Sequence, residues 1–566
     1  MIVVNGQYPG PLLEANWGDW IEVTVVNNRS EGTSIHWHGF LQTGTPFMDG
    51  TPGISQCPIA PGASFTYRFR AELYGTSWWH SHYSAQYIDG MVGPIVIHGP
   101  VTTPYDIDLG PVVVSDWFHG YYENLVYQIQ HAAPGTAVTP PEAENVLING
   151  KASFVCGTVP NYQSDPVDAT CTPDAPLAQF KVQSGKKHLL RFINTGAEGV
   201  LFASVDGHQL EVVANDFVPV EPYNTSYITL AVGQRTDAIF YATGKPTDSV
   251  WLRVTGGPSG EIPGKGALAP PGTGGCNINT GFNNETLAAM YYEDADTSIP
   301  PNTTSDIPIE PTYIAPFACA NDIHEGTPFY PIPAMDADIN LDLVITGGYN
   351  SSGDFVWWFN NQTFLVDFND PILLDAKLGV KDFNVFRQVY DWSNATSVRL
   401  NVTGVGFPAV HPMHVHGHNM QILSSGIGYW DGSITNPENP ARRDTWALPP
   451  LGYSVFQWNL TSKPSLHLDL EIDRKLTEKQ TREYGPSTAT SLGTRVKVCS
   501  STSSRAMSRK SWKSLTSWLR HAETGVPGLA RTSSTSSTLV FELLLFIIIS
   551  HSFDHTTWSR VVGVPL

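Results

Sequence analysis

The chain has 566 residues, of which 41% are hydrophobic and 15% are charged, and its formal net charge is −20 at pH 7. This length exceeds what one hydrophobic core usually organises, so about three to four domains are expected. The acidic balance argues against nucleic acid as a partner, because binding to phosphates requires an excess of lysine and arginine. The 50 glycines and 43 prolines, together with many β-branched and aromatic residues, are typical of turn-rich β structure.

Residues 1–103 are predicted to form a first β domain. Residues 20–26 and 64–69 alternate between apolar and polar side chains, which is the pattern of a strand with one buried face. An apolar run at residues 93–98 closes this domain. Two His-X-His pairs, each expected on a strand, occur in this domain: His36 with His38, and His80 with His82.

Residues 104–255 are predicted to form a second β domain, and its isolated histidines suggest no metal site. Four strands are expected in it, at residues 111–115, 145–149, 188–193 and 226–230. Residues 256–311 are rich in glycine and proline and are interpreted as a linker.

Six cysteines in so long a chain indicate a few disulfide bonds and not a disulfide-dense scaffold. Cys156 and Cys171 are close enough in sequence for a local disulfide, and Cys276 and Cys319 are a plausible pair that would tie down the linker.

Residues 312–458 are predicted to form a third β domain, with strands near residues 342–345, 397–402 and 419–423. This domain contains four histidines within eight residues: His411, His414, His416 and His418. On an extended strand, residues i and i+2 point to the same face, so His414 and His416 can direct two imidazoles to one place.

Three His-X-His pairs from distant segments predict imidazoles that converge on metal, although a single histidine is more often a surface or core residue. Imidazole binds zinc, copper, iron and nickel. Zinc rarely needs more than four ligands. Seven histidines therefore favour a multinuclear copper cluster.

These motifs resemble those of fungal multicopper oxidases and, within that family, of ascomycete-type laccases. The matching segments are residues 36–42, 48–59, 75–82, 105–111, 231–237 and 411–418, and the resemblance covers residues 2–458. It implies an all-β fold of three consecutive cupredoxin-like Greek-key barrels, the third truncated. It also implies four copper ions and a laccase that oxidises p-diphenols and related phenols in one-electron steps while reducing O2 to water.

The resemblance further implies a role for each matched histidine. His36 and His414 correspond to ligands of the type 2 copper, and His411 corresponds to a ligand of the type 1 copper. The type 3 coppers would be bound by His38, His80, His82 and His416, whereas His418 is no ligand in the family.

Two carboxylates are candidate catalytic groups by the same resemblance. Asp49 matches an acidic position that assists proton delivery to reduced oxygen, although an aspartate before Gly50 is also typical of a turn. Asp216 corresponds to the acid that contacts phenolic hydroxyls and could accept the phenol proton, with Glu221 as a nearby alternative.

The sequence changes character after Trp458. Residues 459–566 contain 14 Lys and Arg and 8 Asp and Glu, a net charge of +6, against 18 and 44 and a net charge of −26 for the preceding residues. This Ser/Thr-rich tail is predicted to be disordered, and its apolar run at 539–549 is too short to span a membrane, which needs about 20 residues.

The fourth family motif, His-Cys-His followed by a further histidine, is absent, since Cys499 has no adjacent histidine. The type 1 cysteine, one type 1 histidine and two type 3 histidines are therefore missing. A frameshift, a retained intron and a true pseudoenzyme remain alternative explanations. Ascorbate oxidase, ferroxidase and a copper-binding relic without catalysis are the alternative functions.

Secretion to the extracellular space is expected, because a clustering of Asn-X-Ser/Thr sites favours a glycoprotein. These sites are Asn28, Asn224, Asn284, Asn302, Asn350, Asn361, Asn394, Asn401 and Asn459. No signal peptide is visible, and the resemblance implies that an N-terminal segment is missing. The expected partners are phenols and O2, with no membrane, and the protein is expected to be a monomer.

Overall fold

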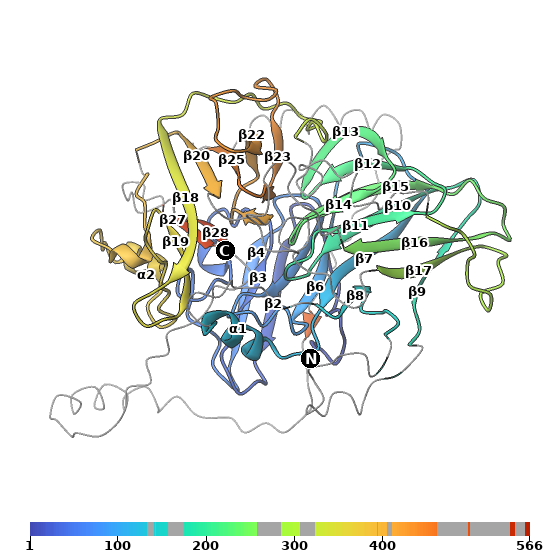
Figure 1. Cartoon of the computed structure of the whole chain (residues 1–566), viewed down its shortest axis with the longest axis horizontal. Coiled ribbons are helices and arrows are strands. Elements are labelled where there is room, and N and C mark those ends of the chain that lie inside the picture. The colour runs from blue at the N-terminus through green and yellow to red at the C-terminus, as the bar shows by residue number, and fades with distance from the viewer. Residues whose placement is uncertain are drawn as a thin grey trace.

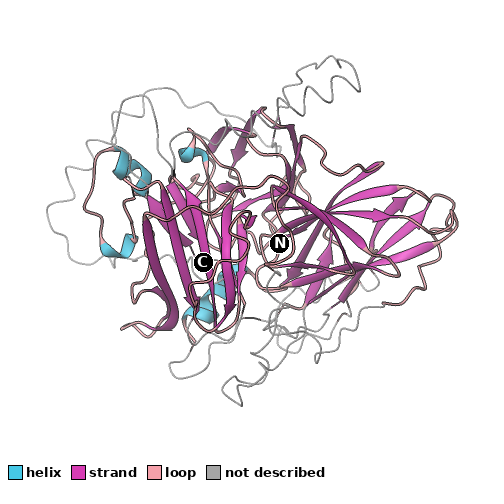
Figure 2. Ribbon diagram, turned by 90° about the horizontal axis from the view of Figure 1, so that it is seen from above, coloured by secondary structure: helices cyan, strands magenta, loops and turns pink. Residues whose placement is uncertain are grey.

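The computed structural model is built almost entirely from β-strands that gather into three domains (Figures 1 and 2). The prediction of an all-β fold is confirmed. The residues that the structure describes are 1–132, 141, 143–154, 156, 172, 175–256, 285–305, 323–392, 394–404 and 410–460, with the backbone of 496–497, 544–548 and 561–565.

The first domain pairs its strands so that two histidine-bearing strands are neighbours. Its elements are β1 (Leu13–Asn16), β2 (Trp20–Val26), β3 (Ile35–Trp37), the 3-10 helix η1 (Pro46–Met48), β4 (Ser64–Arg70), β5 (Gly75–Ser81) and β6 (Val92–His98). One sheet has the order β1-β6-β5-β3, and β2 pairs with β4. Side chains such as Trp37, Tyr67 and Phe69 fill the core between the sheets, so β3 and β5 have fixed positions.

The second domain packs a six-stranded sheet, of order β13-β12-β15-β10-β7-β8, against a five-stranded sheet, of order β14-β11-β16-β17-β9. Its first elements are β7 (Ile107–Trp117), α1 (Tyr122–Gln130), β8 (Asn145–Ile148), β9 (Ala178–Val182), β10 (Lys187–Asn194) and β11 (Leu201–Val205). The remaining strands are β12 (Leu210–Asn215), β13 (Val218–Thr225), β14 (Ile228–Leu230), β15 (Arg235–Tyr241), β16 (Ser249–Gly256) and β17 (Glu285–Tyr292).

The expected linker at residues 256–311 is wrong for the segment that forms β17. This strand pairs antiparallel with β16 and parallel with β9, so the second domain extends beyond residue 255. Its side chains are mostly buried, because the strand lies inside the sheet. Residues 257–284, and with them Cys276, lie outside the described residues, as does Cys319.

The third domain is a six-stranded sheet of order β19-β18-β20-β25-β22-β23, beside a two-stranded sheet of β21 and β24. Its elements are β18 (Ile339–Tyr349), β19 (Phe355–Phe359), α2 (Ile372–Lys377), η3 (Val385–Arg387), β20 (Ser397–Gly404), β21 (His411–His414), β22 (Met420–Ile427), β23 (Ala441–Arg443), β24 (Thr445–Leu448) and β25 (Gly452–Asn459). A core around Met413, Trp446 and Phe456 joins the two sheets, so the strand bearing the histidines is anchored to the main sheet.

Three short strands lie in the tail that was predicted to be disordered: β26 (Val496–Lys497), β27 (Leu544–Ile548) and β28 (Val561–Pro565). The strand β26 pairs in parallel with β2 of the first domain, and β27 pairs with β28. The sequence of the tail does not predict these strands, because it shows no regular alternation of apolar and polar residues.

The three domains contact one another, and strands β22 and β23 of the third domain lie beside β12 and β13 of the second (Figure 1). Backbone hydrogen bonds join the first domain to the third, from Ile372 N to Gly53 O and from Leu373 N to Ile54 O. Another, from Phe329 N to Pro219 O, joins the second domain to the segment that leads into the third. In the described part of the chain, no helix has the length and apolar character needed to cross a bilayer.

Candidate metal centre

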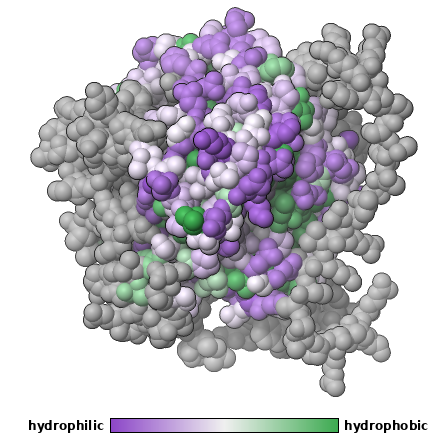
Figure 3. All heavy atoms as spheres, turned by 90° about the vertical axis from the view of Figure 1, so that its right-hand side faces the viewer, coloured by the Kyte–Doolittle hydropathy of each residue, from purple (hydrophilic) through white to green (hydrophobic). Residues whose placement is uncertain are grey.

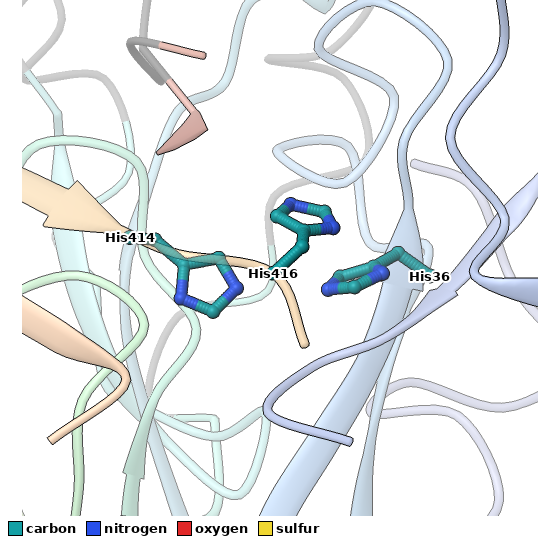
Figure 4. Close-up of side chains that lie close together, drawn as sticks. All are labelled: His36, His414 and His416. Carbon is teal, nitrogen blue, oxygen red and sulfur yellow. The ribbon is translucent and has the colours of Figure 1, made fainter. Parts of the chain in front are cut away.

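Six of the seven predicted ligands converge where the first and third domains meet. His36 on β3 lies directly across from His80 on β5, so strand pairing alone brings two His-X-His motifs together. His414 is the last residue of β21, and His416 follows it in the turn. The rings of His36, His414 and His416 face a common space although they come from distant segments (Figure 4).

The ring distances are those of a single cluster. Ring centroids are 3.9 Å apart for His36 and His416, 5.3 Å for His36 and His80, and 5.4 Å for His82 and His416. The centroids of His38 and His414 lie 3.7 Å apart with an interplanar angle of 11°. Three sets of side chains place one potential ligand atom each within 4.8 Å of one another: His36/His414/His416, His36/His38/His80 and His38/His414/Asp444.

Asp49 holds two of these rings from the first domain. Its Oδ2 accepts hydrogen bonds from His416 Nδ1 at 2.7 Å and from Thr51 Oγ1 at 2.9 Å, and its backbone oxygen accepts one from His36 Nδ1 at 2.8 Å. Burial works against ionisation of Asp49, but its interactions with His36 and His416 outweigh burial and hold its pKa well below the ordinary value. Asp49 is therefore an ionised acceptor that fixes which nitrogen of His416 faces the cluster.

Asp444 and Thr445 hold the other pair of rings. His38 Nε2 donates to Asp444 Oδ1 at 3.2 Å, and His414 Nδ1 donates to the backbone oxygen of Asp444 at 2.8 Å. The Thr445 hydroxyl lies 3.1 Å from His38 Nε2 and 3.2 Å from His414 Nδ1. These contacts leave His38 Nδ1 and His414 Nε2 directed at the cluster.

The donor set fits copper. Burial, followed by the charges of neighbouring groups, lowers the pKa of five of the six imidazoles, those of His38, His80, His82, His414 and His416, and the pKa of His416 falls to about 4. Neutral imidazole is the form that binds metal. Four buried ring nitrogens of the cluster have no hydrogen-bond partner among the described residues: His38 Nδ1, His80 Nε2, His82 Nε2 and His414 Nε2. Buried polar atoms normally have partners, so these nitrogens fit a site at which a cation would bind.

His411, the seventh predicted ligand, lies apart from this cluster. Its ring packs edge-on against Trp357 at 5.5 Å, and burial lowers its pKa to about 4. No group of three metal-binding side chains within the described residues includes His411 or a cysteine. Of the cysteines that the structure describes, Cys57 is exposed and Cys156 is in a disulfide bond, while Cys171 and Cys499 lie outside the described residues. These residues do not fit a type 1 copper, which needs a cysteine thiolate.

Asp216 does not lie where a substrate-contacting acid must lie, and this corrects the expectation from the sequence. Asp216 directly follows β12 and has a left-handed backbone conformation (φ 53°). Its side chain has 0% exposure. Its oxygens accept hydrogen bonds from the backbone N–H of Arg235 and from the Arg443 guanidinium. A carboxylate with no exposed surface cannot meet a substrate hydroxyl, whereas the alternative, Glu221, is exposed.

Sequence reasoning missed Asp444, Thr445 and Arg235, which surround the histidines. The available signal was a pair of charged residues, Arg443 and Asp444, separated only by Thr445 from an apolar run at 446–448. Charged residues are almost never fully buried unless they are paired. Here both are buried, and they interact with the second domain.

Most of the chain is similar to known multicopper oxidases. Three family models, each described as multicopper oxidase, match residues 1–102, 108–268 and 362–465. "Oxidoreductase OpS5" of Beauveria bassiana is 36% identical over 83% of this chain and 74% of that protein. Laccase-3 of Botryotinia fuckeliana is 34% identical over 81% of this chain and 96% of that protein. The crystal structure of the laccase from Botrytis aclada is 31% identical, with a TM-score of 0.70, over 81% of this chain and 78% of that chain.

Proposed function

The chain belongs to the multicopper oxidase family and is a copper-dependent oxidoreductase of laccase type with cupredoxin-like domains, and on this premise we propose its substrates and its copper ligands. The proposed reaction is one-electron oxidation of p-diphenols coupled to reduction of O2 to water. The proposed ligands of the type 2 and type 3 coppers are His36, His38, His80, His82, His414 and His416.

The observation that carries this proposal is the convergence of six buried imidazoles from two domains on one space. Bound copper would supply the one-electron redox chemistry and the binding site for O2. The chain's own residues orient the rings, keep them neutral by burial, and exclude bulk water from the cluster. Asp49 is proposed to assist proton delivery, because its ionised carboxylate accepts a hydrogen bond from His416 at the cluster and the residue is 9% exposed.

A second candidate function is copper binding without turnover. It is favoured by the surroundings of His411, where the described residues provide no cysteine thiolate. Without that ligand, electrons from a phenol have no type 1 copper through which to enter. We therefore expect the 566-residue chain to bind copper at the histidine cluster, to be colourless and not to oxidise phenols.

The copper ligands are tested by titrating the purified full chain with Cu(II). Copper per chain is measured by elemental mass spectrometry, and nitrogen coordination is measured by electron paramagnetic resonance. Removal of a residue that only supports a metal ligand typically lowers metal affinity by about 10- to 100-fold. We expect the double variant His36→Ala/His414→Ala, which removes two proposed ligands, to lose more copper affinity than that. His188→Gln is the matched control, because His188 is buried in the second domain and its Nε2 accepts from Gln183 N. Equal copper binding by both variants would refute the proposed ligands.

Substrate class is tested on a chain that carries a complete laccase C-terminal segment. Oxygen uptake with hydroquinone, ascorbate and Fe(II) is compared side by side. The proposal predicts the highest kcat/KM for hydroquinone. Preference for ascorbate or for Fe(II) would instead assign the chain to one of the alternative oxidase activities.

We also propose that the protein is extracellular, monomeric and glycosylated. The asparagines at 28, 224, 302, 350, 361 and 394 are exposed, which glycosylation requires. The face seen in Figure 3 is mainly hydrophilic with scattered apolar residues, which suits a protein surrounded by water. A mass shift of the native protein after glycosidase treatment is the expected result, and an unglycosylated cytosolic product would contradict it.

A further inference from the structure

The second domain provides none of the proposed copper ligands, yet one of its side chains reaches the cluster's supporting contacts. Arg235, the first residue of β15, has 0% side-chain exposure. Its Nη1 and Nη2 donate to Asp444 Oδ1 and Oδ2, both at 2.6 Å. Its Nε donates to the backbone oxygen of Thr76 on β5 at 3.1 Å. A single guanidinium therefore joins the second domain to the first and to the third.

The geometry of this pair is demanding. Two parallel hydrogen bonds between a guanidinium and a carboxylate fix the orientation of both groups, and lysine cannot reproduce them. Gly39, directly after His38, has a φ of 79°, and a Cβ there would lie 2.4 Å from Asp444 Oδ2 and 2.8 Å from Arg235 Nη2. The ion pair thus packs against the backbone that carries His38, which leaves neither partner room to shift.

Asp444 in turn accepts hydrogen bonds from two of the histidine rings and so fixes their orientation. Its Oδ1, which Arg235 holds, accepts from His38 of the first domain, and its backbone oxygen accepts from His414 of the third. Carboxylates in the second layer of a metal site fix the tautomer and the ring orientation of histidine ligands. The parallel stacking of His38 and His414 at 3.7 Å is the arrangement that these contacts maintain.

We infer that Arg235 is a positioning residue that acts through Asp444 to set the orientation of His38 and His414, so that the second domain fixes the copper-binding geometry between the first and third domains. This inference rests on the proposed ligand set. It assigns a specific role to a domain that holds no ligand.

A comparable ion pair elsewhere in the second domain provides the control. Arg253 on β16 donates to both carboxylate oxygens of Asp206, at 2.6 and 3.0 Å, and its side chain is 12% exposed. Among the described residues, the side-chain hydrogen bonds of this pair reach Glu285 and Thr303 and no proposed ligand. Loss of either pair leaves a buried charge without its partner and destabilises the fold, so only an effect on copper separates a positioning role from a structural one.

The experiment compares Arg235→Lys and Asp444→Asn with Arg253→Lys and Asp206→Asn in the full chain. Each protein is titrated with Cu(II), copper hyperfine and nitrogen superhyperfine couplings are recorded by electron paramagnetic resonance, and thermal unfolding is measured without metal. We expect the first two variants to lose about 10- to 100-fold in copper affinity and to show altered couplings. The two controls should keep the parent affinity and spectrum despite a similar fall in Tm.

The double variant Arg235→Lys/Asp444→Asn tests whether Arg235 acts through Asp444. If it does, the double variant loses no more copper affinity than Asp444→Asn alone, because effects transmitted through one contact are not additive. If Arg235→Lys does not fold, Asp444→Asn and Thr445→Val decide the matter, since Thr445→Val removes a hydroxyl near both rings and leaves the ion pair intact.

The outcomes separate the two proposals. If Arg235→Lys and Asp444→Asn match their controls in affinity and spectrum, or if Thr445→Val and Asp444→Asn both bind copper as the parent does, the positioning role is refuted. If the parent and the His36→Ala/His414→Ala variant bind copper alike, the ligand set itself is wrong, which is a failure of the proposed function.

Discussion

The histidines of the motif at residues 411–418 lie in two different places, the histidine cluster and a site beside Trp357. His414 and His416 join four imidazoles of the first domain, and Asp49 and Asp444 hold their second nitrogens. His411 begins the same strand but packs against Trp357, with no cysteine in a metal-binding group among the described residues. The difference shows that a metal site depends on every segment that contributes to it: the cluster draws on residues before 459, whereas the missing type 1 ligands would follow that point.

The largest expected effect, on colour and on phenol oxidation, comes from supplying the type 1 copper ligands that are missing beside His411. Replacing residues 460–566 with a laccase C-terminal segment that carries His-Cys-His should produce a blue protein with a turnover of about 10 s⁻¹, the median for enzymes. The unaltered chain should show neither colour nor phenol oxidation. Visible absorption and oxygen uptake with hydroquinone measure both. A blue, phenol-oxidising preparation of the unaltered chain would show that the type 1 ligands have been misplaced.

The absence of the type 1 ligands after residue 459 leads to a prediction about the transcript that encodes the chain. The charge balance and the β pattern both change near residue 459, so we expect the spliced transcript, or a single-base shift near codon 459, to restore a His-Cys-His motif. Sequencing of the transcript across codons 440–500 measures this directly, and a transcript that maintains the present reading frame would contradict it.

A fall in pH should affect His411 and His416 alike, because burial lowers the pKa of both side chains to about 4. The unfolded chain, with histidine pKa values near 6.5, binds these protons first as the pH falls. Stability present above about pH 6.5 should therefore be lost towards pH 4, by about 3 kcal/mol for His416. Denaturant unfolding of the metal-free chain between pH 7 and 4 measures this loss. His411→Gln and His416→Gln should each flatten the profile, and a profile unchanged in both variants would contradict the shared effect of burial.

Removing the carboxylate that supports the cluster should weaken copper binding there. Asp49→Asn keeps the size of the side chain but replaces the ionised acceptor of His416 Nδ1, so copper affinity should fall about 10- to 100-fold. Isothermal titration with Cu(II) measures the change. Affinity equal to that of the parent would mean that the backbone alone orients His416.

The smallest effect is expected from Trp357→Ala, which alters the surroundings of His411 and leaves the contacts of the cluster in place. Copper affinity of the cluster should stay within about twofold of the parent, well below the loss expected when an outer contact of the cluster is removed. In the chain with the completed C-terminal segment, the same variant should change the type 1 absorption. A large loss of cluster copper would show that the two places are coupled through β21.

Local patterns were sufficient to predict the β class and to select the histidines that are proposed as ligands. The His-X-His spacing places imidazoles on one face of an extended segment, and the number of such pairs indicated a multinuclear copper site before any folding was considered. Alternation identified β2 and β4. It did not identify β17, which lies between two Gly/Pro-rich stretches, and only its pairing with β9 and β16 defines it.

The sequence by itself determined which kinds of side chain could hold copper, because that depends on residue type and on the period of the strand. The tertiary structure alone decided which carboxylates support those side chains. His38 and Asp444 are 406 residues apart in the chain, and Arg235 meets Asp444 across 209 residues. The same docking buries Asp216 beneath Arg235 and Arg443, although its local sequence resembles that of a substrate-contacting acid. Contacts of this kind depend on how the three domains pack together, and no local pattern contains that information.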